Sequence, residues 1–135
     1  MKIKLDKGAQ LPVRKHPTDA GLDLSSPSRV TVPAHGFSFI DTGIHIELPH
    51  GTVGMIKSRS GLNMRGIQCE GVIDEQYTGS IGIVLYNHSS YDYIVEYGER
   101  IAQLVIIPCV YEPVEVVDKL AETERGEKGF GSTGK

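Results

Sequence analysis

Hydrophobic and polar residues alternate with a period of two along most of this 135-residue chain. Such alternation is typical of strands that bury one face and expose the other to water. Gly, Pro, Asn and Asp separate the alternating segments, which favours many short strands joined by turns. The predicted strands cover residues 29–33, 37–48 with a bend at Gly43, 52–58, 80–87, 93–95, 101–110 and 113–117. This pattern predicts an all-β sandwich or barrel.

The chain fits one domain with a polar tail. Residues 101–110 are almost continuously apolar, which is typical of a strand buried on both faces. No window has a sustained period of 3.6, and at most one helical turn is expected, around residues 61–65. A chain of this length buries roughly two-thirds of its unfolded surface, which is enough for a real core. We therefore expect a β domain over residues 1–117 and a mobile C-terminal arm over residues 118–135.

The net charge and the cysteine content limit the classes of binding partner and the cellular location that we expect. The net charge is −3 and no basic stripe is present, so we expect no nucleic-acid partner. The start Met-Lys-Ile-Lys-Leu and the lack of a long apolar run predict neither a signal peptide nor a membrane partner. Cys69 and Cys109 form no CxxC pair, so we expect two free thiols and a cytoplasmic location.

Two polar stretches suit an oxyanion. Asp23 stands between two leucines, and Arg59 with Ser60 and Gly61 follows the predicted strand 52–58. A guanidinium group can bind a phosphate in bidentate fashion, and a glycine lets the backbone approach closely. Taken alone, Asp23 also fits an ordinary turn, and Arg59 with Ser60 fits an ordinary surface loop.

Two further stretches place polar groups beside apolar ones. Val72 and Ile73 precede Asp74, so they would form an apolar wall from which this acid points, and Tyr77 lies three residues later. Gln103 stands near the start of the most apolar strand, where an amide is expected to have a fixed hydrogen-bonding role. Taken alone, Asp74 could cap a loop and Gln103 could satisfy a neighbouring backbone group.

The last eighteen residues cannot build a core, because glycines 126, 129, 131 and 134 leave too few side chains to offset the ordering entropy. They do carry groups that suit a nucleotide: Arg125, Ser132 and Thr133 supply donors, and Phe130 offers a face to a base. We interpret the segment as an arm that closes over a nucleotide; a disordered tail is the alternative.

These five stretches, in this order, resemble the five motifs of the trimeric deoxyuridine triphosphatases (dUTP diphosphatases), and they span residues 20–134. The resemblance implies a β jelly roll and a homotrimer with three active sites at the subunit junctions. One subunit's arm would close over a site made by the others. The implied reaction is Mg²⁺-dependent hydrolysis of dUTP to dUMP and pyrophosphate, which limits dUTP and supplies dUMP for thymidylate synthesis.

The resemblance also implies roles for individual residues. Asp74 would be the general base, Asp23 would hold Mg²⁺ through water, and Tyr77 would stack under the deoxyribose and exclude a ribose 2′-hydroxyl. The remaining roles follow by motif: phosphate binding by Arg59, Ser60 and Gly61, α-phosphate contact by Gln103, uracil recognition by the backbone of Gly71, Val72 and Ile73, uracil stacking by Phe130, with Gly131 beside it, and outer-phosphate binding by Arg125, Ser132 and Thr133.

Two features depart from the family pattern. The stretch 67–70 is about one residue shorter than is usual, and Glu70 would bring negative charge near the base pocket. Asp19 stands where Ser is more usual and adds an acid near the metal. Two alternatives remain: a dCTP deaminase-like relative with the same fold, and a regulatory protein of this fold that binds a partner when loaded with nucleotide.

Overall fold

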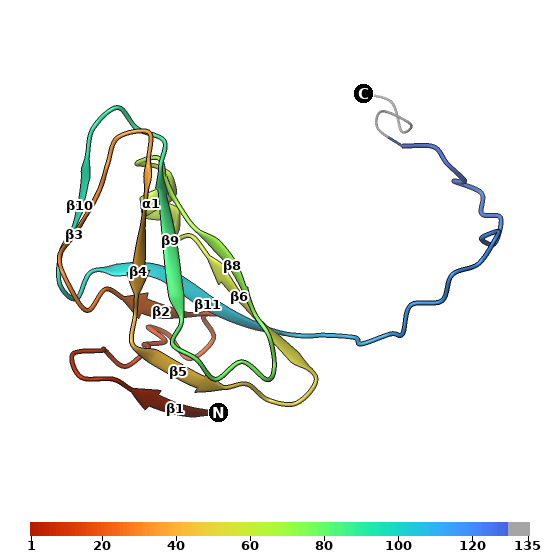
Figure 1. The fold of residues 1–135 in the computed structure, drawn as a ribbon, viewed down its shortest axis with the longest axis horizontal. Coiled ribbons are helices and arrows are strands. Elements are labelled where there is room, and N and C mark those ends of the chain that lie inside the picture. The colour runs from red at the N-terminus through yellow and green to blue at the C-terminus, as the bar shows by residue number, and fades with distance from the viewer. Residues whose placement is uncertain (130–135) are drawn as a thin grey trace.

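The computed structural model describes residues 1–129, which form a β-sheet body followed by an extended C-terminal segment (Figure 1). The described part contains eleven strands and one single-turn helix. Their bounds are β1 (Lys2–Leu5), β2 (Gly21–Ser25), β3 (Val30–Val32), β4 (Phe37–Asp41), β5 (Ile44–Glu47), β6 (Thr52–Lys57), α1 (Ser60–Asn63), β7 (Ile67–Gln68), β8 (Glu70–Ile73), β9 (Gly82–Asn87), β10 (Tyr93–Val95) and β11 (Arg100–Pro108). The all-β prediction is confirmed.

The strands pair antiparallel in four groups. The largest sheet has the order β2-β11-β6-β8, and a second has the order β4-β9-β7. Two further pairs, β1-β5 and β3-β10, join distant parts of the chain. The long strand β11 lies between β2 and β6, so it places residues of three separate sequence stretches side by side.

The core is built from the apolar positions of the alternating pattern. Leu24, Ile56 and Leu104 of the four-stranded sheet are almost fully buried, as are Ile83 and Leu85 of β9. Burial of an aliphatic side chain of this size contributes about 1.5–3 kcal/mol. The core therefore holds together the sheets whose strand ends carry the polar stretches.

Most of the predicted strands occur with shifted ends, but one prediction is wrong. The segment 37–48 breaks into β4 and β5 at Gly43, which has φ +66°, as the predicted bend requires. Residues 113–117 form no strand, and Val114 and Val116 are each 95% exposed. An alternating pattern needs a neighbouring strand for its backbone bonds, and residues 1–129 offer none to this segment. Strands β1, β2, β7 and β8 were not predicted from the sequence.

The chain leaves the body after β11. Residues 109–129 contain no strand or helix, and Figure 1 shows them extending away from the sheets. Within residues 1–129, no helix has the length and apolar character needed to cross a membrane.

Candidate functional site

The register of β11 builds a polar cluster at one end of the four-stranded sheet. Gln103 pairs with Asp23 of β2 on one side and with Lys57 of β6 on the other. Ser58 and Arg59 follow β6 directly, so they reach the same end. A pocket of about 270 Å³ lies here, lined by Lys15, Asp19, Asp23, Arg59, Ser60, Gly61, Arg100 and Gln103. The structure thus brings together Asp23, Arg59, Ser60, Gly61 and Gln103.

Two guanidinium groups hold Asp23. Arg59 Nε lies 3.0 Å from one carboxylate oxygen and Arg100 lies 2.9 Å from the other. The Asp23 side chain is 16% exposed, so these charge-assisted bonds are partly shielded from water. Asp19 and Lys15 add one charge of each sign, which leaves the lining with three cations and two acids. This excess of positive charge suits an anionic ligand.

Gln103 is fixed by its neighbours. Its side-chain nitrogen donates to the Ser58 carbonyl at 3.1 Å. Gly21 lies against the other side, where an added Cβ would overlap the Gln103 amide oxygen and lie 2.9 Å from its Cβ. The predicted helical turn is present as α1, starting at Ser60 immediately beside this cluster.

Arg100 is a site residue that sequence reasoning missed. Arg100 and Gln103 are three positions apart, so regular alternation would place them on opposite faces of β11. The pairing of β11 with β2 shifts register between Arg100 and Ala102, which is a bulge. A bulge re-aims the side chains beside it, and here both residues line the same pocket. The alternating pattern contains no signal of this shift.

Asp74 belongs to a different part of the chain surface. It follows β8, where its backbone carbonyl accepts a 3.0 Å bond from the Tyr77 amide. Asp74 is exposed, and the Tyr77 hydroxyl donates to the Ser80 carbonyl at 2.8 Å. Ile73 is buried, but Val72 is 59% exposed. The expectation that both residues form an apolar wall is therefore wrong for Val72, because its side of the edge strand β8 faces outward.

A single chain does not bring Asp74 to the Asp23 cluster. Ile73 pairs with Gly54 near the start of β6, whereas Arg59 follows its end. Five residues of extended backbone separate Gly54 from Arg59, which is roughly 16 Å. Asp74 and the Asp23 cluster therefore lie at opposite ends of β6.

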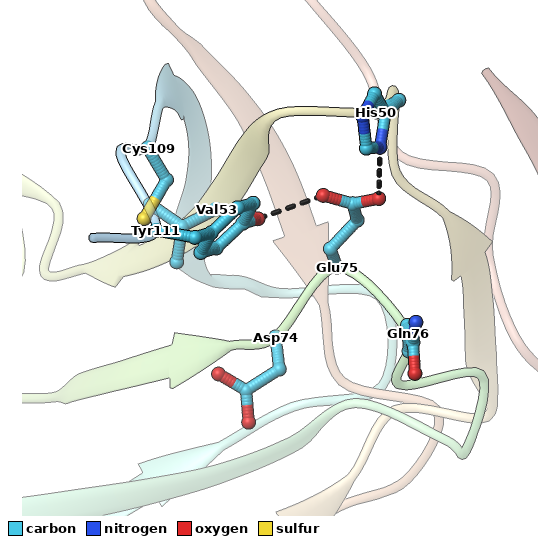
Figure 2. Close-up of a pocket in the computed structure, with 7 residues that line it drawn as sticks. All are labelled: His50, Val53, Asp74, Glu75, Gln76, Cys109 and Tyr111. Atoms are coloured by element: carbon cyan, nitrogen blue, oxygen red, sulfur yellow. Dashed lines mark hydrogen bonds and ion pairs between the residues drawn. The ribbon is translucent and has the colours of Figure 1, made fainter. Parts of the chain in front are cut away.

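A second pocket of about 400 Å³ lies beside Asp74, lined by His50, Val53, Asp74, Glu75, Gln76, Cys109 and Tyr111 (Figure 2). Glu75 is its central group and accepts hydrogen bonds from His50, Gly51 and Tyr111. These bonds lower the pKa of Glu75 to about 2. The bond to Glu75 raises the pKa of Tyr111 to about 12. Sequence reasoning missed this network, whose members are distant in sequence.

The charge of Glu70 is balanced locally. Its carboxylate lies 2.9 Å from Lys57 Nζ, directly opposite it across the β6–β8 pair. This bond lowers the pKa of Glu70. Cys69, the preceding residue, is buried, and both cysteines are free thiols as predicted.

The arm residues are described in part. Arg125 is exposed, and its Nε donates to the Lys128 carbonyl at 3.2 Å. Phe130, Gly131, Ser132 and Thr133 lie outside the described residues.

Comparison with known proteins identifies relatives over almost the whole chain. Residues 7–134 match the family described as dUTPase. The deoxyuridine 5'-triphosphate nucleotidohydrolase of Crocosphaera subtropica is 43% identical, with 98% of this chain and 96% of the relative covered. That of Clostridium tetani is 45% identical, with 100% and 97% covered.

Solved structures give the same result for the fold. The dUTPase of Staphylococcus bacteriophage 80alpha with dUPNHPP superposes with a TM-score of 0.92 at 34% identity, covering 98% of this chain and 97% of that chain. A mutant dUTPase of the S. aureus phage phi11, described with a structural Mg(II) ion, gives 0.81 at 27% identity and covers 87% and 96%.

Fold and relatives together define an all-β enzyme that acts on a nucleoside triphosphate, and the jelly-roll expectation agrees with the superposed structures. The chain belongs to the dUTPase family, a family of dUTP diphosphatases.

Proposed function

We propose that this chain hydrolyses dUTP to dUMP and pyrophosphate by attack of water on the α-phosphorus, with Asp74 as the general base. The observation that carries the proposal is the division of the predicted site residues into a cationic pocket around Asp23 and a separate turn that bears Asp74. The first group suits a triphosphate, and the second supplies an acidic group and a nearby sheet edge.

The cationic pocket would hold the phosphates. Arg59 and Arg100 present guanidinium groups, and Gly61 leaves open space beside the backbone. Gln103 would contact the α-phosphate while its nitrogen bonds Ser58. Fixed donors aimed at developing negative charge stabilise a transition state without reorganising.

The other group would bind the nucleoside. β8 is an edge strand, so one side of its backbone is not used in the ladder with β6. Edge backbone groups of residues 71–73 are therefore suited to read uracil, as free strand edges bind other polar groups. Tyr77, 45% exposed and tied to Ser80, would lie against the deoxyribose.

The separation of the two groups supports a homotrimer with shared sites. Water activated by Asp74 must reach an α-phosphate held near Gln103, but the two groups lie at opposite ends of β6 within one chain. A second subunit could supply the missing group at each junction. Residues 118–135 would then close over the nucleotide as an arm from one of the subunits.

The residues of the cationic pocket fit Mg²⁺. Both Asp23 oxygens already accept bonds from arginines, so Asp23 would hold the ion through water, with Asp19 in the same pocket. Mg²⁺ commonly keeps several waters and binds one or two carboxylates together with substrate phosphates. When bound, the ion would neutralise phosphate charge. We also propose that the protein acts in the cytoplasm, where it limits dUTP and supplies dUMP for thymidylate synthesis.

Replacing Asp74 tests the chemistry. Asp74→Asn should bind dUTP and stay folded, but kcat should fall about 10²–10⁴-fold, because the general base is lost. Isothermal titration measures binding, and release of pyrophosphate measures turnover. In ¹⁸O-water the wild-type enzyme should label dUMP. Near-normal turnover by Asp74→Asn, or label in pyrophosphate, would contradict the mechanism.

A further inference from the structure

The carboxylate of Glu75 joins three segments that are distant in sequence (Figure 2). Oε1 accepts from His50 Nδ1 at 2.7 Å, and Oε2 accepts from the Gly51 amide at 2.9 Å and from the Tyr111 hydroxyl at 2.7 Å. The Tyr111 oxygen also lies 3.2 Å from the Thr52 carbonyl. A hydroxyl has one hydrogen, and the shorter distance and the negative charge assign it to Glu75.

Each of the three segments has a different place in the fold. His50 and Gly51 form the turn between β5 and β6, and Tyr111 stands three residues after the end of β11. Glu75 itself lies in the turn that carries Asp74. The Cys109 amide adds a backbone bond to the Gly51 carbonyl at 2.9 Å. Glu75 therefore ties the beginning of the C-terminal segment to the Asp74 turn.

Asp74 has no such anchor of its own. Among residues 1–129, no side chain or backbone donor bonds its carboxylate, and Figure 2 shows it pointing away from Glu75. Its place is set by the backbone of its turn, which the Tyr77 amide closes on one side. Glu75, the next residue, has a side chain that fastens this turn to the body.

We propose that Glu75 is a positioning residue that fixes the Asp74 turn relative to the point where the C-terminal segment leaves the body. The inference rests on the proposed function, in which Asp74 is the base and this segment closes over the nucleotide. A displacement of the C-terminal segment would be transmitted to Asp74 through the hydrogen bond between Tyr111 and Glu75. Since the three hydrogen bonds to Glu75 need no proton on its carboxylate, the connection is present at neutral pH.

Two substitutions break the connection from its two ends. Glu75→Gln removes the charge and keeps the shape, and Tyr111→Phe removes one oxygen from a side chain that is 60% exposed. Glu47→Gln is the matched control, because Glu47 at the end of β5 is an exposed carboxylate with one ion-pair partner, Lys2 at 3.0 Å. Thermal melting shows that each variant is folded.

The reaction rate of the Cys109 thiol tests the connection between Tyr111 and Glu75 in the absence of nucleotide. Cys109 is partly exposed and lies in the same pocket as Tyr111, whereas Cys69, the other of the chain's two cysteines, is buried. Reaction with a disulfide reagent should be several-fold faster at Cys109 in Glu75→Gln and Tyr111→Phe than in the wild type. Cys69 gives the internal reference, and Glu47→Gln should react like the wild type.

Kinetics separate positioning from simple structural support. Both variants should lower kcat about tenfold while the KM for dUTP changes less than twofold, because misplacement of a base affects the chemical step. The double variant should lose no more than the less active of its parents, since both changes break one connection. A change confined to KM, additive losses, or lower kcat with an unchanged Cys109 rate would each overturn the inference.

Asp74→Asn separates the two proposals. If Asp74→Asn is nearly inactive but Glu75→Gln and Tyr111→Phe keep the wild-type kcat, the positioning role is wrong and the proposed function stands. If Asp74→Asn keeps near-normal turnover, the proposed role of Asp74 as general base is wrong, and with it the positioning role.

Discussion

The substitution Gly21→Ala should displace the Gln103 side chain from its position, although residue 103 itself is unchanged. Gly21 lies on β2 against the Gln103 side chain, and its φ is not in the left-handed region, so the requirement for glycine is steric. An added Cβ would overlap the Gln103 amide oxygen and lie 2.9 Å from its Cβ and 3.1 Å from its Cδ. The glutamine must therefore leave its present position.

The cost follows from the contacts that are lost. Overpacking costs about 1–3 kcal/mol, and loss of the 3.1 Å bond from Gln103 to the Ser58 carbonyl adds about 1 kcal/mol. These terms lower the free energy of unfolding by about 2–4 kcal/mol and the Tm by roughly 5–15 °C. Because Gln103 would also leave the α-phosphate, kcat/KM for dUTP should fall up to about 10²-fold.

Thermal melting and steady-state hydrolysis, measured well below the lowered Tm, check both parts. Gln103→Ala is the reference, and the double variant Gly21→Ala/Gln103→Ala should match it in kcat/KM while recovering part of the lost stability. Gly21→Ala with normal kcat/KM would refute the placement of Gln103 at the reacting phosphate. A double variant far less active than Gln103→Ala would show that Gly21 acts by another route.

Three further predictions concern the sugar, the arm and pH. Tyr77→Ala should reduce the dUTP/UTP ratio of kcat/KM more than it weakens dUTP binding. An unchanged ratio would show that another residue excludes UTP. Truncation before Arg125 should leave the Tm without nucleotide unchanged and lower kcat/KM steeply. When the truncated protein is mixed with full-length Asp74→Asn, hybrid trimers should regain activity. If no activity returns after verified subunit exchange, the arm of one subunit does not complete the site of another. Both ring nitrogens of His45 face acceptors, Thr78 O at 2.8 Å and Asp6 Oδ2 at 3.0 Å, and the Asp6 bond raises the pKa of His45. The stability that this imidazolium contributes is full below its ordinary pKa of 6.5 and is lost as pH rises through the raised value. The Tm advantage over His45→Gln should therefore shrink as pH rises above 6.5, and a constant difference would contradict the assignment.

Alternation in the sequence determined the fold class and most strands, because a strand with one buried face must place apolar residues at every second position. The bend at Gly43 and the turn after Ser60 were also predictable, since each has a local chemical signature. The five polar stretches pointed to the family, which the relatives confirm over residues 7–134.

Strand partners and side-chain direction were decided only by the tertiary structure. Residues 113–117 alternate like a strand, but they form none because residues 1–129 provide no neighbour for them. Arg100 lies in the Asp23 pocket because a bulge in β11 changes the face on which it lies.

The antiparallel register of β6 and β8 likewise places Asp74 near the start of β6, whereas Arg59 follows the other end of this strand. The distance between two groups depends on which strands pair and in which register, and these choices are made by contacts between segments far apart in sequence. The sequence by itself therefore determined the fold class and the family and predicted which residues carry the chemistry, and the tertiary structure decided which of these residues one chain can bring together.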